Sequence, residues 1–230
     1  MGSSSFISII IPTLNEAESI EAQLGELHAL GEDDMEVVVV DGGSGDDTLA
    51  LAAPLASHAL SSAPGRALQM NVGAQASQGD ILLFLHADTR LPHGALDEIR
   101  QALAGNREWG RFDIRLQGDH RMLKVIALAM NVRSRLSGIA TGDQTLFMTR
   151  RAFEAVGGFP EQPLMEDIEI SKRLKRLSRP ACLHSRVVSS ARRWEGHGLW
   201  STIWLMWRLR YRYWRGADSR QLVKEYRHAR

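Results

Sequence analysis

Cysteine is nearly absent from this chain, since Cys182 is the only one among 230 residues. A single thiol excludes an intramolecular disulfide framework and a zinc site built on cysteine clusters, and it fits a reducing compartment. Residues 1–6 show no basic stretch followed by an apolar one, and the longest uncharged run, 48–65, contains prolines and serines. Such segments are typical neither of a signal peptide nor of a membrane span. We therefore expect a cytoplasmic protein.

An excess of charge of one sign is also lacking, because 28 basic and 27 acidic residues leave a net charge of +1. Bulk charge therefore favours no polyanion, and we expect no nucleic-acid partner. Hydrophobic residues form 44% and charged residues 24% of the chain, which excludes the disordered and low-complexity classes. The length suits one α/β domain with a small appendage.

Three short apolar runs predict buried strands: Phe6–Ile11, Val37–Val40 and Ile81–Leu85. Pro12 should stop the first strand, and Asn15, with Glu18 three residues later, predicts the N-cap of a helix that reaches about Leu30. Later patterns predict, in order, a weak strand at 58–61, helices at 66–76 and 92–103, a strand at 109–116, a helix at 120–136, a strand at 144–149, a helix at 166–177 and a strand at 181–189. Because strands and helices alternate in the first half, we expect a mostly parallel α/β sheet with both faces covered.

Polar side chains follow each of the three clear strands. They are Thr13, Asn15 and Glu16 after the first, Asp41 at the end of the second, and His86 and Asp88 after the third. Since ligands bind beyond the carboxyl ends of parallel strands, we expect these side chains to meet at one edge. The sequence lacks both the Walker A loop and the dinucleotide glycine spacing. Asp88 points instead to a divalent ion, Mg²⁺ or Mn²⁺, shared with phosphate oxygens, and Arg66 would add a cationic contact to the phosphates.

A second polar group occurs later in the chain, where Asp143 and Gln144 precede a predicted strand and Glu166 and Asp167 open a predicted helix. Acidic residues in a first helical turn are favoured by the helix dipole, so simple capping is one interpretation. The other interpretation makes one of the two acids a general base, held within hydrogen-bonding reach of an acceptor hydroxyl.

Taken together, these motifs resemble family 2 glycosyltransferases with a GT-A fold. The resemblance runs from about Phe6 to Gly198 and is carried by the segments 12–16, 41–48, 79–88, Met165-Glu166-Asp167 and Arg192-Arg193-Trp194. Within the family, the chain is similar to a small bacterial subgroup associated with radical-SAM and selenium-related genes, some members of which are described as arsenosugar-biosynthesis glycosyltransferases.

The resemblance implies metal-dependent, inverting transfer of a sugar from a nucleoside diphosphate sugar to an acceptor hydroxyl. It implies that Asp167 is the catalytic base beside Glu166, and that Asp88, with His197 as a further ligand, holds Mg²⁺ or Mn²⁺. The nucleotide-sugar pocket would be lined by Pro12, Thr13, Asn15, Glu16, Asp41, Arg66, His86 and Asp88. The acceptor side would contain Asp143, Gln144, Arg193 and Trp194.

Two departures from the family pattern leave alternatives open. The usual Asp-Asp-Gly-Ser is here Asp41-Gly42-Gly43-Ser44, and the usual Asp-x-Asp is His86-Ala87-Asp88. Loss of the first Asp of Asp-x-Asp makes metal binding depend more on Asp88 and the diphosphate, unless His86 helps to hold the metal. The same loss keeps a catalytically weak binding module among the rivals. A nucleotidyltransferase on a similar sheet is the other rival, but segment 12–15 lacks the glycine- and arginine-rich loop that it needs.

The C-terminal segment differs from the rest in composition. Residues 190–230 contain ten basic and three acidic residues, together with five of the six tryptophans. Trp200, Trp204, Trp207, Tyr211 and Trp214 share one face of a predicted helix. One interpretation packs this face on the catalytic domain or on a second copy, as a homodimer. The other lays 199–215 on an anionic membrane at the inner face, with a lipid-linked acceptor. We expect a glycosyltransferase domain at 1–198 and a helical extension at 199–230.

Overall fold

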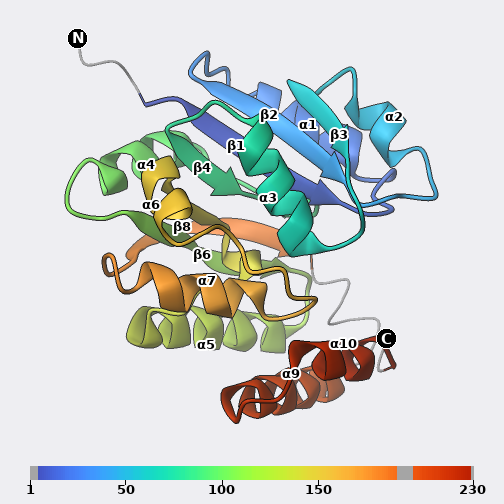
Figure 1. Ribbon diagram of the computed structural model, residues 1–230, viewed down its shortest axis with the longest axis vertical. Coiled ribbons are helices and arrows are strands. Elements are labelled where there is room, and N and C mark those ends of the chain that lie inside the picture. The colour runs from blue at the N-terminus through green and yellow to red at the C-terminus, as the bar shows by residue number, and fades with distance from the viewer. Residues whose placement is uncertain (1–4, 191–198, 229–230) are drawn as a thin grey trace.

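An eight-stranded sheet organises the chain in this computed structural model, which describes residues 5–190 and 199–228 (Figure 1). The strands are β1 (Ile7–Thr13), β2 (Met35–Asp41), β3 (His58–Ser61), β4 (Ile81–Phe84), β5 (Thr89–Arg90), β6 (Trp109–Gln117), β7 (Leu146–Thr149) and β8 (Ala181–Ser190). The helices are α1 (Ile20–His28), α2 (Thr48–Ala52), α3 (Arg66–Ala76), α4 (Ala95–Leu103), α5 (Arg121–Ser137), α6 (Arg150–Ala155), α7 (Glu166–Leu174), α9 (Leu199–Trp214) and α10 (Ser219–His228), with a short 3-10 helix η1 (Gly142–Gln144).

The strand order is β3-β2-β1-β4-β7-β6-β8-β5. The first four strands in this order are mutually parallel, β7 runs antiparallel to both of its neighbours, β8 is parallel to β6, and β5 is antiparallel to β8. Thr13 lies opposite Asp41, and Ile10 lies opposite Phe84. The carboxyl ends of β1, β2 and β4 therefore meet at one edge, and the predicted α/β architecture is confirmed, with antiparallel strands added in its second half.

The core has two layers, one on each face of the sheet. Alternate residues of β1 and β2 enter different layers, so that Ile9 and Val39 face one side while Ile10 and Val38 face the other. The first layer is closed by α1, α4 and α5, and the second by α3, α6 and α7. Because both faces are covered, the strands consist of unbroken apolar runs rather than alternating ones.

Two predicted boundaries near the start of the chain are wrong. β1 continues through Pro12 to Thr13, because β4 pairs only with residues 7–10 of β1 and the missing N–H of Pro12 costs no hydrogen bond there. Asn15 is not a helix N-cap: its φ is 55°, its side chain accepts a hydrogen bond from the Gly45 N–H, and α1 begins at Ile20.

In the second half of the chain, most of the predicted elements occur within a few residues of their expected bounds. Gln144 is an exception, since it belongs to η1 and β7 begins only at Leu146. Within the described ranges, no helix combines the length and the apolar character that a membrane crossing requires.

The C-terminal helices α9 and α10 pack on the rest of the chain through a small third apolar cluster, in which Leu209 and Leu222 contact Met165. The side chains of the aromatic face of α9 are 58–75% exposed. This face therefore does not pack on the preceding part of the chain, and the prediction that it does is wrong. Gly216, with φ of 90°, follows α9, and Asp218 accepts a hydrogen bond from the Arg220 N–H at the start of α10. The proposed division after residue 198 falls beside residues outside the described ranges and stays a prediction.

Candidate functional site

The loops that follow β1 and β2 are joined to each other by hydrogen bonds. The Asn15 N–H donates a hydrogen bond to Ser44 Oγ at 2.8 Å, and the Gly45 N–H donates one to Asn15 Oδ1 at 2.8 Å. One residue on, the Glu16 N–H donates to Thr48 Oγ1 at 2.8 Å. The left-handed backbone at Asn15 makes this pairing possible, and asparagine tolerates that conformation better than most residues do. The two strand ends therefore form one rigid rim.

Asp41 organises the second of these loops from within. Its carboxylate accepts bonds from the Gly43 and Ser44 N–H groups at 2.9 and 2.8 Å, and also from the Ser44 and Thr13 hydroxyls. The side chain is buried, and these four bonds use the ordinary accepting capacity of a carboxylate. Asp41 thus shapes the rim, and Gly43 beside it has φ of 87°, which favours glycine.

Gln69 of α3 holds the same strand ends from the other side, and sequence reasoning missed it. Its buried amide donates to the carbonyls of Thr13 at 2.7 Å and Val40 at 2.8 Å. A Cβ on Gly42 would lie 3.0 Å from this amide, so Gly42 permits the close approach. An amide in the middle of a helix gives no local signal of this role, because its partners lie 29 and 56 residues away.

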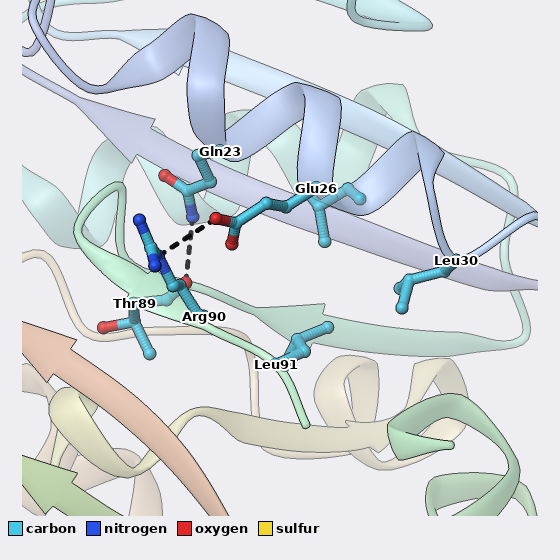
Figure 2. A pocket seen from close by; sticks show the side chains of 7 residues that line it. Gln23, Glu26, Leu30, Thr89, Arg90 and Leu91 are labelled. Carbon is cyan, nitrogen blue, oxygen red and sulfur yellow. Dashed lines mark hydrogen bonds and ion pairs between the residues drawn. The ribbon is translucent and has the colours of Figure 1, made fainter. Parts of the chain in front are cut away.

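The turn that carries His86 and Asp88 is anchored by Gln23 of α1. The Gln23 amide donates to the carbonyl of His86 at 2.8 Å and to that of Thr89 at 3.1 Å. Figure 2 shows Gln23 lining a pocket together with Thr89 and Arg90, and Arg90 pairs there with Glu26 at 3.1 Å. The pocket is lined by none of the predicted site residues, and we assign it to support of the turn rather than to ligand binding.

Asp88 is half-buried, and its carboxylate accepts a 3.3 Å bond from the Thr89 hydroxyl. Within residues 5–190 and 199–228, no three acidic, histidine or cysteine side chains are grouped closely enough to hold a metal ion. One carboxylate nevertheless fits a cation of the Mg²⁺ type, because such ions are commonly held by one or two carboxylates and completed by substrate phosphates and water. His197, predicted as a further ligand, lies outside the described residues.

A tight contact joins the His86 turn to η1 on the other side of the rim. His86 Nδ1 lies 3.4 Å from Asp143 Oδ1, and a Cβ on Gly142 would lie 2.6 Å from His86 Nε2. The Gly142 N–H in turn donates to Asp167 Oδ2 at 3.0 Å. The structure therefore brings His86, Asp143 and Asp167 into one neighbourhood, although 81 residues separate the first from the last.

Asp167 is the most perturbed carboxyl group of this neighbourhood. Burial is the main cause that raises its pKa to about 6, and the negative charge of Glu166 adds to the effect. Hydrogen bonds from the N–H groups of Gly142 and Ile168 act in the opposite direction without cancelling it. A carboxylate with a pKa near 6 is a better proton acceptor at neutral pH than an ordinary one.

Arg66, at the first position of α3, points across to the start of α7. Its guanidinium lies 3.6 Å from Glu166 Oε1, and Glu166 itself is buried. Burial acts to lower the pKa of Arg66, but Glu166, Asp143 and Asp167 together raise it above its ordinary value. Arg66 thus stays charged and partly balances the group of acids.

Arg133 of α5 was not identified from the sequence. Its Nε and Nη2 atoms are buried and have no hydrogen-bond partner within the described part of the chain. Burial lowers the pKa of this guanidinium, while the charges of Asp167 and Asp143 act to raise it. A cation with two buried, unused donors beside two acids fits a site for a polar ligand.

Gln144, predicted on the acceptor side, is completely buried. Its amide donates to Ser134 and Asn131 of α5 at 3.1 and 3.3 Å, and its carbonyl accepts from the Thr141 N–H. Gln144 therefore ties η1 to α5 and supports Asp143 rather than facing a ligand. Arg193 and Trp194, the other predicted acceptor-side residues, lie outside the described ranges.

The residue before the two acids of α7 has an unusual backbone. Met165 has φ of 69°, which is strained for a residue with a side chain, and its side chain is buried against Leu209 and Leu222. Close by, Tyr213 of α9 accepts a 3.3 Å bond from Gln162 and lies 3.5 Å from Glu169 Oε2. The C-terminal helices thus support the segment that places Asp167.

A family model described as "Glycosyl transferase family 2" matches residues 8–156, which is more than half of the chain. The match contains the β1, β2 and β4 strand ends together with η1, but it ends before α7. Among curated proteins, the chain finds no match.

Solved structures share the fold at low identity. A mannosyltransferase from Pyrobaculum calidifontis in complex with GDP-Man and Mn²⁺ has a TM-score of 0.59 and 22% identity over 82% of this chain and 57% of its own. Residues 1–349 of S. aureus TarS give 0.63 and 17%, over 81% and 61%. Glucosyl-3-phosphoglycerate synthase from Mycobacterium tuberculosis gives 0.59 and 21%, over 81% and 71%. The chain thus spans about three fifths of the length of the first two, and the likeness shows the fold.

Proposed function

Because the chain belongs to glycosyl transferase family 2 and has the GT-A fold, we propose that it transfers a sugar from a nucleoside diphosphate sugar to an acceptor hydroxyl. The observation that carries the proposal is the position of Asp167. It is a half-buried carboxyl group with a raised pKa, joined through Gly142 and His86 to the ends of the parallel strands. Ligands of such sheets bind at that edge.

The donor would lie along the rim formed after β1, β2 and β4. Pro12, Thr13, Asn15 and Glu16 form its first segment, and Asp41 gives the second its shape. Arg66 supplies a cation to the diphosphate and balances Glu166 when no donor is bound. In this arrangement His86 separates the donor side from Asp143 on the acceptor side.

Asp88 would hold Mg²⁺ or Mn²⁺ together with diphosphate oxygens. Such a cation, when bound, neutralises negative charge that develops on the leaving nucleoside diphosphate. The mannosyltransferase with the same fold is solved with Mn²⁺ and GDP-Man, which supports this assignment. Metal dependence is part of the proposal.

The transfer needs one protein base. As the acceptor oxygen attacks the anomeric carbon from the face opposite the diphosphate, its proton passes to Asp167. The bond from that carbon to the diphosphate oxygen breaks, and its electron pair leaves with the diphosphate. The configuration is therefore inverted. Since the leaving group needs no proton, a single carboxylate is sufficient, in contrast to the pair used in glycoside hydrolysis.

Activity should rise with pH through the titration of this base. The pKa of Asp167 is raised to about 6, so below pH 6 the carboxyl group is mostly protonated in the folded protein and cannot accept the acceptor proton. We expect kcat/KM to fall about tenfold for each pH unit below that value and to level off above it. Initial rates measured from pH 4.5 to 8 at constant ionic strength test this. A profile that is flat from pH 5 to 8 would contradict the assignment.

Donor binding tests the proposal most directly. We expect a nucleoside diphosphate with Mn²⁺ to raise the melting temperature in a thermal-shift screen, since ligands of the folded state stabilise it. The screen should include UDP, GDP and their sugars, each with and without Mn²⁺, with nucleoside monophosphates as controls. If no nucleotide stabilises the protein, the proposed function is wrong.

Finer features of the proposal rest on the sequence. They are the bacterial subgroup associated with radical-SAM and selenium-related genes, a cytoplasmic location at the inner membrane face and a lipid-linked acceptor. A homodimer through the same aromatic face is the alternative to the membrane. For the membrane, support comes from the exposed aromatic face of α9 within 199–215.

A further inference from the structure

Two helices expose apolar stripes that the core does not use. On α5, Val125, Leu128, Val132 and Leu136 are 47–83% exposed. On α9, Trp200, Trp204, Trp207, Tyr211 and Trp214 are 58–75% exposed. The spacing within each set is three or four residues, so each set forms one face of its helix. Stripes of this size are uncommon on the surface of a soluble monomer and mark an interaction site.

The opposite faces of both helices are buried. Leu123, Ile126 and Ala127 of α5 enter the core below β6, and Leu209 of α9 packs on Met165. In Figure 1, α5 and the α9–α10 pair lie at the same end of the long axis, opposite α1 and α2. Each stripe is therefore turned away from the core at that end.

Helices α5 and α9 are more basic than the rest of the molecule. Helices α5 and α9 together contain seven basic residues and no acidic one, although the whole chain has a net charge of only +1. Arg121 and Lys124 on α5 are exposed, and neither forms an ion pair within the described residues. Arg208 and Arg212 of α9 share Glu225 of α10, and Arg208 also lies 5.0 Å above the Trp204 ring.

We propose that the stripes of α5 and α9 form one surface that binds the interfacial region of an anionic bilayer. Tryptophan and tyrosine are favoured at the level of the lipid headgroups, and valine and leucine reach the acyl boundary. Basic side chains beside the stripes complement anionic headgroups. A second copy of the chain fits less well, because pairing like stripes would bring two strongly basic ends together.

This surface extends the proposed membrane contact from one helix to two, and its link to catalysis rests on the proposed function. The helix α5 carries Arg133, whose charge interacts with Asp167, on a different side from its apolar stripe. On α9, Leu209 packs on Met165, two residues before Asp167. Both membrane-facing helices therefore border the acceptor side, so the acceptor hydroxyl would be presented from the lipid surface.

Vesicle binding tests the surface. The full-length protein should co-sediment with vesicles of equal phosphatidylcholine and phosphatidylglycerol, and binding should weaken in high salt and with phosphatidylcholine alone. Tryptophan emission should shift to the blue on binding, because Trp200, Trp204, Trp207 and Trp214 are exposed while Trp109 is already buried. Absence of binding to the anionic vesicles would overturn the proposal.

One double substitution in each stripe tests separately how α5 and α9 contribute to vesicle binding. Leu128→Glu with Val132→Glu on α5, and Trp204→Glu with Trp207→Glu on α9, should each lower the vesicle-bound fraction roughly tenfold. Leu177→Glu is the control, since Leu177 is 47% exposed but belongs to neither stripe. Unchanged binding of the α5 variant would overturn the two-helix surface, and so would a dimer that either variant dissociates.

A second readout keeps this test distinct from the test of the proposed function. All three variants should melt cooperatively and keep the stabilisation by nucleoside diphosphate and Mn²⁺. If wild-type protein binds vesicles but no nucleotide, the surface stands and the proposed function fails. If it binds nucleotide but no anionic vesicle, the surface fails alone.

Discussion

Replacing Asp167 by asparagine is expected to lower kcat by roughly 10²- to 10⁴-fold, which is the usual contribution of a positioned general base. The asparagine keeps the size of the side chain but cannot take the acceptor proton. Donor affinity should survive, because Asp167 contacts Gly142 and Ile168 rather than the rim formed after β1 and β2. The dependence of kcat/KM on pH near 6 should disappear together with the activity.

The measurement pairs initial rates with calorimetric titration of the nucleoside diphosphate and Mn²⁺. Glu169→Gln is a suitable control, because it removes the same charge two residues away on α7, where Glu169 is half-buried and pairs with Lys172 and Arg173. Wild-type turnover in the Asp167 variant would remove this residue from the role of base. Loss of donor binding would instead assign Asp167 to the donor side.

Replacing Asp88 by alanine is expected to weaken nucleotide binding in the presence of Mn²⁺ by at least about tenfold. The reason is the sparse donor set: within the described residues no cluster of three ligands exists, so the loss of one carboxylate removes a large share of the protein's contribution to the cation. Without Mn²⁺, variant and wild type should bind the nucleotide equally weakly. The substitution should therefore weaken only the part of the nucleotide affinity that depends on Mn²⁺.

Titration calorimetry with UDP or GDP, with and without Mn²⁺, measures this difference. Asp97→Ala provides the control, because Asp97 is 70% exposed and contacts only Arg100 of its own helix among the ion pairs of the described residues. Equal affinities of wild type and Asp88→Ala in Mn²⁺ would show that the cation, if bound, is held elsewhere.

The sequence predicted the fold well where burial follows a local pattern. The apolar runs of β1, β2 and β4 are buried on both faces, as is typical of strands in a sheet that helices cover on both sides. Polar residues at the ends of these runs then had to meet at one edge, and the structure brings Thr13 beside Asp41. Local backbone details were less predictable, and Asn15 is a rim residue rather than a helix cap because its partners, Ser44 and Gly45, are distant in sequence.

Tertiary structure alone decided which polar residues support the site. Gln23, Gln69 and Arg133 lie in helices whose patterns look ordinary, and their roles depend on carbonyls and carboxylates ten or more residues away. The sequence also did not show that the α5 and α9 stripes face outward, since periodicity identifies an apolar face but not what covers it. Hydrophobic periodicity is a property of neighbouring residues and can be read along the chain. Electrostatic environment and exposure depend on what the folded chain places beside each residue, and only the packed structure determines them.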